Sequence, residues 1–189
     1  LTADQDLVIN GLMQSIDDPE ETLEVRRRVV EALGPITTSE VHEIIREFYD
    51  DEDERLKASA VYAMGLSGDE EWLDFIIDEM SNPSPLLRYE SAHAAAELGS
   101  EEVVNELANL VDDADPEVQW MAVTAMGSIG GPQAGEILRK LLNHPDSSVK
   151  QAAMDSLEQI EAFGDPMKLM ESDSLFDGSN ESAEDQSTP

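Results

Sequence analysis

Two groups of acidic side chains are the residues best suited to chemistry, because carboxylates that lie close together in a chain can bind a divalent cation. One group is the run Asp-Asp-Glu-Asp-Glu at residues 50–54, and the other lies at residues 112–115. Their spacing is not that of an EF-hand loop. Each group precedes a predicted helix, where carboxylates accept hydrogen bonds from free amides and favour the positive end of the helix dipole. We therefore interpret both groups as helix caps, with cation binding as the alternative, and expect no metal site.

Motifs for nucleophilic and phosphate chemistry are missing from the sequence. There is no cysteine, which excludes disulfides, thiolate metal sites and cysteine nucleophiles. No nucleophile elbow, phosphate-binding loop or zinc signature occurs. The glycine-rich stretch at residues 127–131 lies at an expected helix end, where helix capping accounts for it. We therefore expect a protein that is not an enzyme and that needs no cofactor.

The excess of acidic over basic residues makes some classes of partner unfavourable. The 189 residues include 43 Asp and Glu against 11 Lys and Arg, which gives a formal net charge of −32. Nucleic acids and anionic membranes are disfavoured, because binding to them depends on cationic side chains. No apolar run approaches the ~18 residues of a membrane span, and no signal peptide is recognisable at the start. We expect a monomeric cytoplasmic protein, whose acidity suits either a basic partner or a salt-rich cytoplasm.

A gapless internal repeat organises the chain. Five similar segments begin 31 residues apart, at Val25, Leu56, Leu87, Val118 and Val149. Counted from these residues as place 0, aliphatic or small residues recur at places 4, 5, 7, 8 and 11, which is typical of a helix packed on more than one side. Place 7 holds only small residues, namely Ala32, Ala63, Ala94, Ala125 and Ser156. We expect another helix to approach closely there, where the two helices of a unit cross.

Each repeated segment follows turn and cap residues, and a shorter amphipathic stretch lies before each turn. These stretches lie near residues 4–16, 38–49, 69–80, 100–111 and 132–142. No period-two alternation indicates a strand, so the sequence predicts an all-α, right-handed α-solenoid of five two-helix units. We assign residues 1–164 to this solenoid and expect residues 165–189, which are acidic and rich in Ser, to form a disordered tail.

Aromatic side chains recur at two places of the repeat, 2 and 6, that lie one helical turn apart and off the apolar stripe. In the central units these places hold Tyr62, Tyr89, His93 and Trp120, with Met121 adjacent, and in the first unit Arg27. We expect these six residues to line an exposed concave face that binds a partner. The alternative is that the aromatic rings fill gaps between successive repeats. Trp72 occupies an apolar place of a first helix and is predicted to be in the core.

The repeat resembles the HEAT repeats of the short phycobilisome-lyase-like type over roughly residues 4–163. The closest likeness runs from Asp115-Pro116-Glu117-Val118 through Met126-Gly127-Ser128-Ile129-Gly130. This resemblance implies a solenoid in which the cation after each place 0 bridges to a turn of its own or the next unit. That position holds Arg26, Lys57, Arg88, Gln119 and Lys150, so Gln119 is expected to interrupt the ladder between the third and fourth units.

Two activities are known on similar scaffolds. Deoxyhypusine hydroxylases of the HEAT type carry several His-Glu pairs for a di-iron centre, whereas this chain has one, His42-Glu43. We do not expect that activity. Bilin lyases share the repeat, and here Arg27, Arg28 and Arg88 are the candidate cations for the bilin propionates. We keep a bilin lyase, or a subunit of one, as the alternative to our main prediction: a non-catalytic adaptor or assembly factor that binds a basic, amphipathic peptide or helix.

Overall fold

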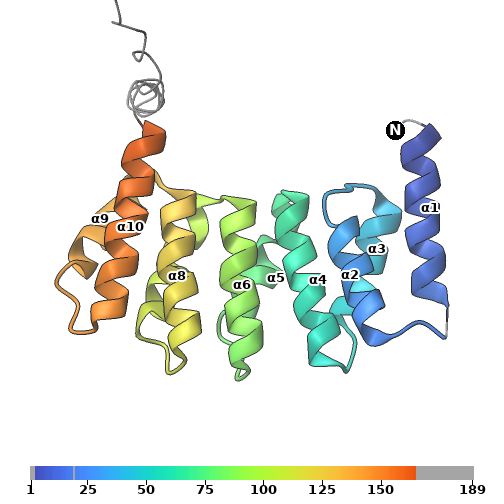
Figure 1. Cartoon of the computed structure of the whole chain (residues 1–189), viewed down its shortest axis with the longest axis horizontal. Helices are drawn as coiled ribbons and strands as arrows, with labels where there is room; N and C mark the ends of the chain where they lie inside the picture. Colours follow the sequence, from blue (N-terminus) through green and yellow to red (C-terminus); the bar gives the residue numbers. More distant parts are fainter. Residues whose placement is uncertain (1–2, 19, 165–189) are drawn as a thin grey trace, which may run out of the picture.

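Helices account for all regular structure in the computed structural model, which describes residues 3–18 and 20–164 (Figure 1). The first helices of the units are α1 (Ala3–Asp17), α3 (Ser39–Tyr49), α5 (Leu73–Glu79), α7 (Val104–Asn109) and α9 (Gly131–Leu141). Short 3-10 helices flank two of them: η1 (Glu70–Trp72) precedes α5, and η2 (Glu101–Val103) and η3 (Leu110–Asp112) enclose α7. The second helices are α2 (Leu23–Leu33), α4 (Glu54–Ser67), α6 (Pro85–Leu98), α8 (Pro116–Ile129) and α10 (Ser147–Gly164).

The second helices form one continuous row. They begin 31 residues apart, each two residues before place 0 of the repeat. Figure 1 shows α2, α4, α6, α8 and α10 side by side, with α3, α5 and α9 in the row behind them. The predicted all-α solenoid of two-helix units is confirmed. The tail expected at residues 165–189 lies outside the described residues.

None of the helices within residues 3–18 and 20–164 has both the length and the apolar character needed to cross a membrane.

Residues in the turns cap the N-terminal ends of the helices that follow them. The Thr22 hydroxyl accepts a hydrogen bond from the Val25 amide at 3.3 Å and so caps α2. Asp53 caps α4, and Asp115 caps α8 by accepting from the Glu117 amide at 2.9 Å. These contacts satisfy amides that have no partner inside the helix. The capping interpretation of the two acidic groups is therefore confirmed for Asp53 and Asp115.

Small residues set the distance between successive second helices. Ala63, Ala94 and Ala125 are fully buried, as predicted. Their partner is different from the one expected: a Cβ atom on Gly65 of α4 would lie only 2.5 Å from the Cα of Ala94 on α6. The close approach therefore joins second helices of neighbouring units and not the two helices of one unit. Ala32 is exposed, because no second helix precedes α2.

Polar contacts of the cations after place 0 tie the second unit to the third and the third unit to the fourth. The Lys57 ammonium lies 2.8 Å from the buried carboxylate of Glu79. The Arg88 guanidinium donates two hydrogen bonds to the Asp113 carboxylate, at 2.7 and 2.8 Å. Gln119 donates to the Asp113 carbonyl at 2.8 Å. The expected interruption between the third and fourth units is wrong, since Arg88 itself spans these units and Gln119 binds the same turn.

Candidate functional site

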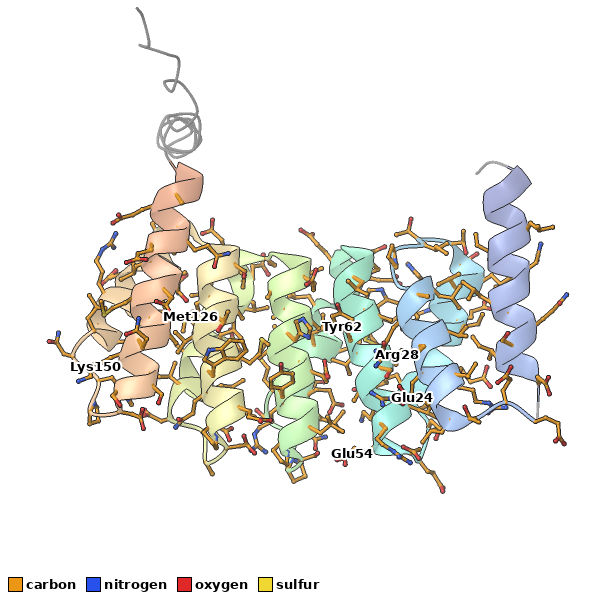
Figure 2. The ribbon with its side chains drawn as sticks, viewed as in Figure 1. Glu24, Arg28, Glu54, Tyr62, Met126 and Lys150 are labelled. Carbon is orange, nitrogen blue, oxygen red and sulfur yellow. The ribbon has the colours of Figure 1, made fainter. Side chains whose placement is uncertain are left out.

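Three of the predicted site residues form one packed group on the row of second helices, which we call the central aromatic cluster: Tyr62, Tyr89 and His93. The ring of Tyr62 on α4 stacks on the ring of His93 on α6, with 4.5 Å between centroids and 24° between planes. Tyr89 lies one turn before His93 on α6 and meets it edge to face at 6.2 Å. Figure 2 shows Tyr62 in front of the row, where α4 and α6 meet. The cluster therefore joins the second and third units.

Trp120 lies on α8, one unit beyond the cluster, and 51% of its surface is exposed. The other tryptophan, Trp72, is fully buried. The backbone carbonyl of Trp120 accepts a hydrogen bond from the Thr124 hydroxyl at 2.7 Å. Trp120 is thus an exposed apolar side chain on the same row of helices as the cluster.

Met121 was expected on this surface, and that expectation is wrong. The side chain is in the core, with 7% of the residue exposed. Its place in the repeat holds two other buried residues, Ser59 and Ala152, but also the exposed Arg28 and the half-buried Glu90. Because small and charged residues share this place, the sequence alone did not assign Met121 to the interior.

Arg27 is held by polar contacts within the first two units. Its guanidinium lies 3.1 Å from Glu24 and donates at 3.1 Å to the Ser59 hydroxyl, which in turn donates to Glu31 at 2.7 Å. Arg28 also pairs with Glu24 and Glu31, at 3.2 and 2.9 Å. Arg27 and Arg28 therefore already have carboxylate partners.

Carboxylates surround the central aromatic cluster. His93 Nδ1 lies 3.4 Å from Glu90, and its Nε2 lies 3.9 Å from Glu97. Burial raises the pKa of the Tyr62 hydroxyl, and the negative charge of Glu97 adds to this effect. Burial likewise raises the pKa of Tyr89, with a further contribution from Glu90. The face accordingly presents aromatic rings in a negative electrostatic environment, which favours cationic groups over anionic ones.

A hollow of about 430 Å³ opens between the beginnings of α6 and α8. Its walls include Leu86, Tyr89 and Glu90 of α6 and Asp115, Glu117 and Val118 at the start of α8. The sequence did not predict this hollow. Its acidic residues occupy different places of the repeat, since Glu90 corresponds to Met121 and Glu117 corresponds to Leu86, so the periodic pattern carries no signal for it. The hollow shares Tyr89 with the aromatic cluster, so the two features are continuous.

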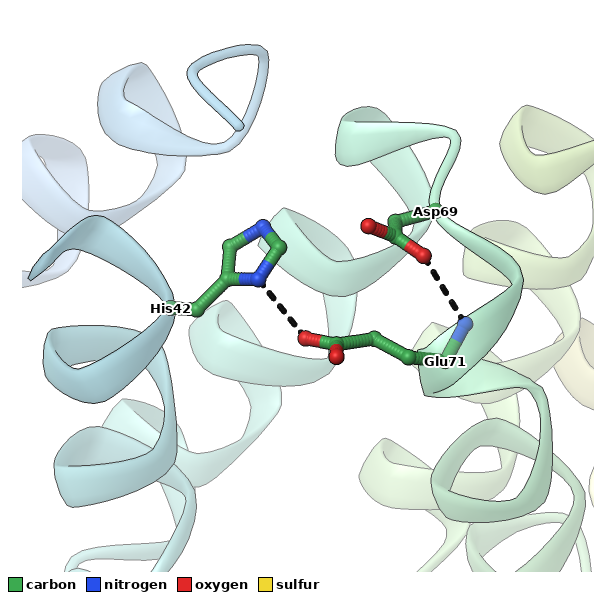
Figure 3. A group of neighbouring side chains, drawn as sticks. All are labelled: His42, Asp69 and Glu71. Carbon is green, nitrogen blue, oxygen red and sulfur yellow. Dashed lines mark hydrogen bonds and ion pairs between the residues drawn. The ribbon is translucent and has the colours of Figure 1, made fainter. Parts of the chain in front are cut away.

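A second polar group lies between α3 and η1 and has atoms close enough to hold a metal ion (Figure 3). His42 Nδ1 lies 2.7 Å from Glu71, and Asp69 accepts a hydrogen bond from the Glu71 amide at 3.0 Å. The Arg46 guanidinium lies 3.3 Å from the same Glu71 oxygen. Because Arg46 already neutralises this carboxylate and Asp69 caps η1, an ion pair between units accounts for the group. The ring of His42 packs edge to face on the buried Trp72, beside the apolar core.

The chain matches known families of repeats. A family model for HEAT repeats matches residues 73–158, and a model described as the PBS lyase HEAT-like repeat matches residues 25–51. The chain therefore contains HEAT repeats in these two ranges. No curated protein sequence matches it.

Solved structures with a similar fold span several functions. One is the complex of CpcE and CpcF of phycocyanin lyase from Nostoc sp. PCC7120, with 19% identity, a TM-score of 0.62, and coverage of 91% of this chain and 71% of that chain. Another is a designed armadillo repeat protein, YIII(Dq.V1)4CPAF, in complex with peptide (KR)4, with 22% identity, a TM-score of 0.52, and coverage of 82% and 84%. Human deoxyhypusine hydroxylase in complex with glycerol has 19% identity, a TM-score of 0.50, and coverage of 82% and 74%. At these identities the likeness concerns the fold alone.

Proposed function

We propose that this protein is a non-catalytic interaction module that binds a basic, amphipathic peptide or helix along its second helices. The observation that carries this proposal is that Trp120 is exposed on α8, the second helix that follows α6 of the central aromatic cluster, whose rings are half-buried. Tyr and Trp dominate the binding energy of many interfaces, because they bury large areas at a small cost in conformational entropy. An adaptor or assembly factor is the class of function that fits such a face.

The charge of the partner is inferred from the carboxylates around the rings. Glu90 and Glu97 flank His93 on α6, and Glu117 lies at the start of α8. The whole chain carries −32, so an approaching cationic segment is attracted at long range and an anionic one is repelled. Charge thus contributes mainly to the rate and selectivity of encounter, while the aromatic contacts contribute most of the affinity.

The designed armadillo protein gives independent support for the mode of binding. It has a similar fold and was solved with the cationic peptide (KR)4. The present chain has carboxylates around Tyr62, Tyr89 and His93. For this reason we propose a cationic peptide as its partner too.

The alternative function is that of a bilin lyase-type enzyme or a subunit of one. It is favoured by the match to the PBS lyase HEAT-like repeat and by the likeness to the phycocyanin lyase complex. It is weakened because the three arginines that would bind the bilin propionates already pair with carboxylates of this chain. Arg27 and Arg28 pair with Glu24 and Glu31, and Arg88 pairs with Asp113. Absorbance spectra of the purified protein with added bilin test this alternative, because specific binding would shift and sharpen the bilin bands.

The main proposal is tested with labelled peptides of one amphipathic pattern, in basic, neutral and acidic versions, by fluorescence anisotropy. We expect only the basic version to bind, and we expect Trp120→Ala to weaken it by about 30-fold, which corresponds to the ~2 kcal/mol of an interface hot spot. Met154→Ala is the matched control, since Met154 is 47% exposed on α10 outside the cluster. Equal affinity of the parent and Trp120→Ala for the basic peptide would contradict the proposal.

A further inference from the structure

The hollow between the starts of α6 and α8 has the size and the walls of a site for one side chain. Its volume of about 430 Å³ is near the lower limit for pockets that hold small ligands. Leu86 and Val118 supply apolar surface, and the half-buried ring of Tyr89 supplies an aromatic wall. A long side chain could therefore bury its aliphatic part here while its polar end meets the acidic residues.

The net charge of the hollow is negative. Glu90, Asp115 and Glu117 contribute three carboxylates, whereas the two helix starts contribute roughly half a positive charge each. Asp115 uses one oxygen to cap α8, and Glu90 lies 3.4 Å from His93. These contacts leave further carboxylate oxygen atoms for a ligand, because each carboxylate can accept about four hydrogen bonds.

The neighbouring cation, Arg88, interacts with the charge of Asp115 but makes no ion pair with Glu90 or Glu117 among the described residues. Arg88 belongs to the same helix turn, yet its guanidinium binds the Asp113 carboxylate and the carbonyls of Asn82 and Pro83. All of these hydrogen bonds go to the turns before α6 and α8. The carboxylates of Glu90 and Glu117 therefore have no arginine partner within the described residues and can bind a cation from outside the chain.

We propose that this hollow binds an arginine side chain of the partner segment, with the guanidinium between Tyr89 and the carboxylates of Glu90 and Glu117. Arginine fits better than lysine, because its planar guanidinium can stack on an aromatic ring and bind carboxylates through two parallel hydrogen bonds. This inference rests on the proposed function and adds a specificity site to it. Since Tyr89 also belongs to the aromatic cluster, the arginine would lie next to the apolar residues of the segment that contact the cluster.

The test uses the basic amphipathic peptide in three versions that carry arginine, lysine or the neutral isostere citrulline at a single variable position. For the parent protein we expect the order of affinity to be arginine, then lysine, then citrulline. Glu117→Gln should weaken the arginine peptide by about tenfold and leave the citrulline peptide nearly unchanged. This variant keeps the α8 cap, because only the Glu117 backbone amide takes part in it. Glu136→Gln is the control: it makes the same change of charge at an exposed position of α9.

The outcomes separate the site from the function. If the parent binds all three peptides equally, or if Glu117→Gln behaves like Glu136→Gln, the arginine site is wrong while the basic partner stands. If the parent binds none of the basic peptides, the proposed function is wrong and the arginine site with it. A loss of affinity that is specific to arginine and to Glu117→Gln supports both.

Discussion

Gly65 and Ala94 bring α4 and α6 so close together that neither residue has room for a larger side chain. A Cβ atom on Gly65 would lie 2.5 Å from both the Cα and the carbonyl oxygen of Ala94. Gly34 meets Ala63 in the same way, and Gly127 meets Ser156. This contact repeats along the row of second helices, and it sets the distance at which Tyr62 of α4 can stack on His93 of α6. The candidate site thus depends on glycine and alanine residues that take no part in it.

Enlarging the small residue at this contact should destabilise the fold. Ala94→Leu is expected to lower the free energy of unfolding by about 1 to 3 kcal/mol, because it overpacks a fully buried site against backbone atoms. Ala32→Leu is the matched control: it makes the same change at the same place of the repeat, where the residue is exposed. Urea denaturation measures both. Similar midpoints for the two variants would contradict the helix contact described here.

The two tryptophans should differ in their contribution to stability. Trp72 is fully buried, so Trp72→Ala is expected to cost about 3 to 5 kcal/mol. Trp120→Ala is expected to cost less, about 1 to 2 kcal/mol, because half of the side chain is already in water. Chemical denaturation followed by circular dichroism gives both values. A strongly destabilised Trp120→Ala would mean that this ring packs between repeats and does not serve as a binding residue.

Arg88 should contribute far more to stability than the exposed arginine of the preceding unit. Removing its side chain leaves Asp113, which is 8% exposed, without its partner, so we expect Arg88→Ala to cost about 3 kcal/mol. Arg55 pairs with Asp53 at the surface, and Arg55→Ala should stay within about 1 kcal/mol of the parent. Thermal and urea unfolding of the two variants test the difference, and equal effects would contradict it.

The same pair predicts a dependence of stability on pH. Hydrogen bonds from Arg88 hold the pKa of Asp113 below its ordinary value. The pair therefore contributes fully above the ordinary pKa of about 4, and its contribution is lost as the pH falls through the lower pKa of the folded state. We expect the parent to lose more free energy of unfolding than Asp113→Asn does when the pH is lowered from about 6 to about 3. Parallel losses in the two proteins would show that Asp113 is not coupled to folding in this way.

Added salt should stabilise the protein. With a net charge of −32, repulsion among carboxylates opposes the compact state. Salt screens this repulsion, since the Debye length falls to about 10 Å at 0.1 M and shortens further at higher concentration. We expect the melting temperature to rise between low salt and about 0.5 M NaCl, as measured by differential scanning calorimetry. A falling melting temperature would mean that the ion pairs outweigh the repulsion.

Much of this architecture was predictable from the sequence, because its information is local and periodic. The step of 31 residues predicted all five second helices, each of which begins two residues before the repeat start. Asp53 and Asp115 were recognisable as caps, since the amides of a first helical turn need acceptors wherever the helix lies. The phase of the repeat also placed Tyr62, Tyr89, His93 and Trp120 on one row of helices, and it predicted the burial of Ala94 and Trp72.

What the tertiary structure alone decided is which surfaces meet. Periodicity states that one side of a helix is covered, but it does not name the neighbour, because burial leaves the same pattern whichever helix covers it. The contact of Ala94 with Gly65, the choice of Asp113 as the partner of Arg88 and the exposure of Ala32 therefore appear only when the units are stacked. The hollow beside Tyr89 has the same origin. It forms between two helix starts that are separate in sequence, and only their packing brings Glu90 and Glu117 to the same cavity.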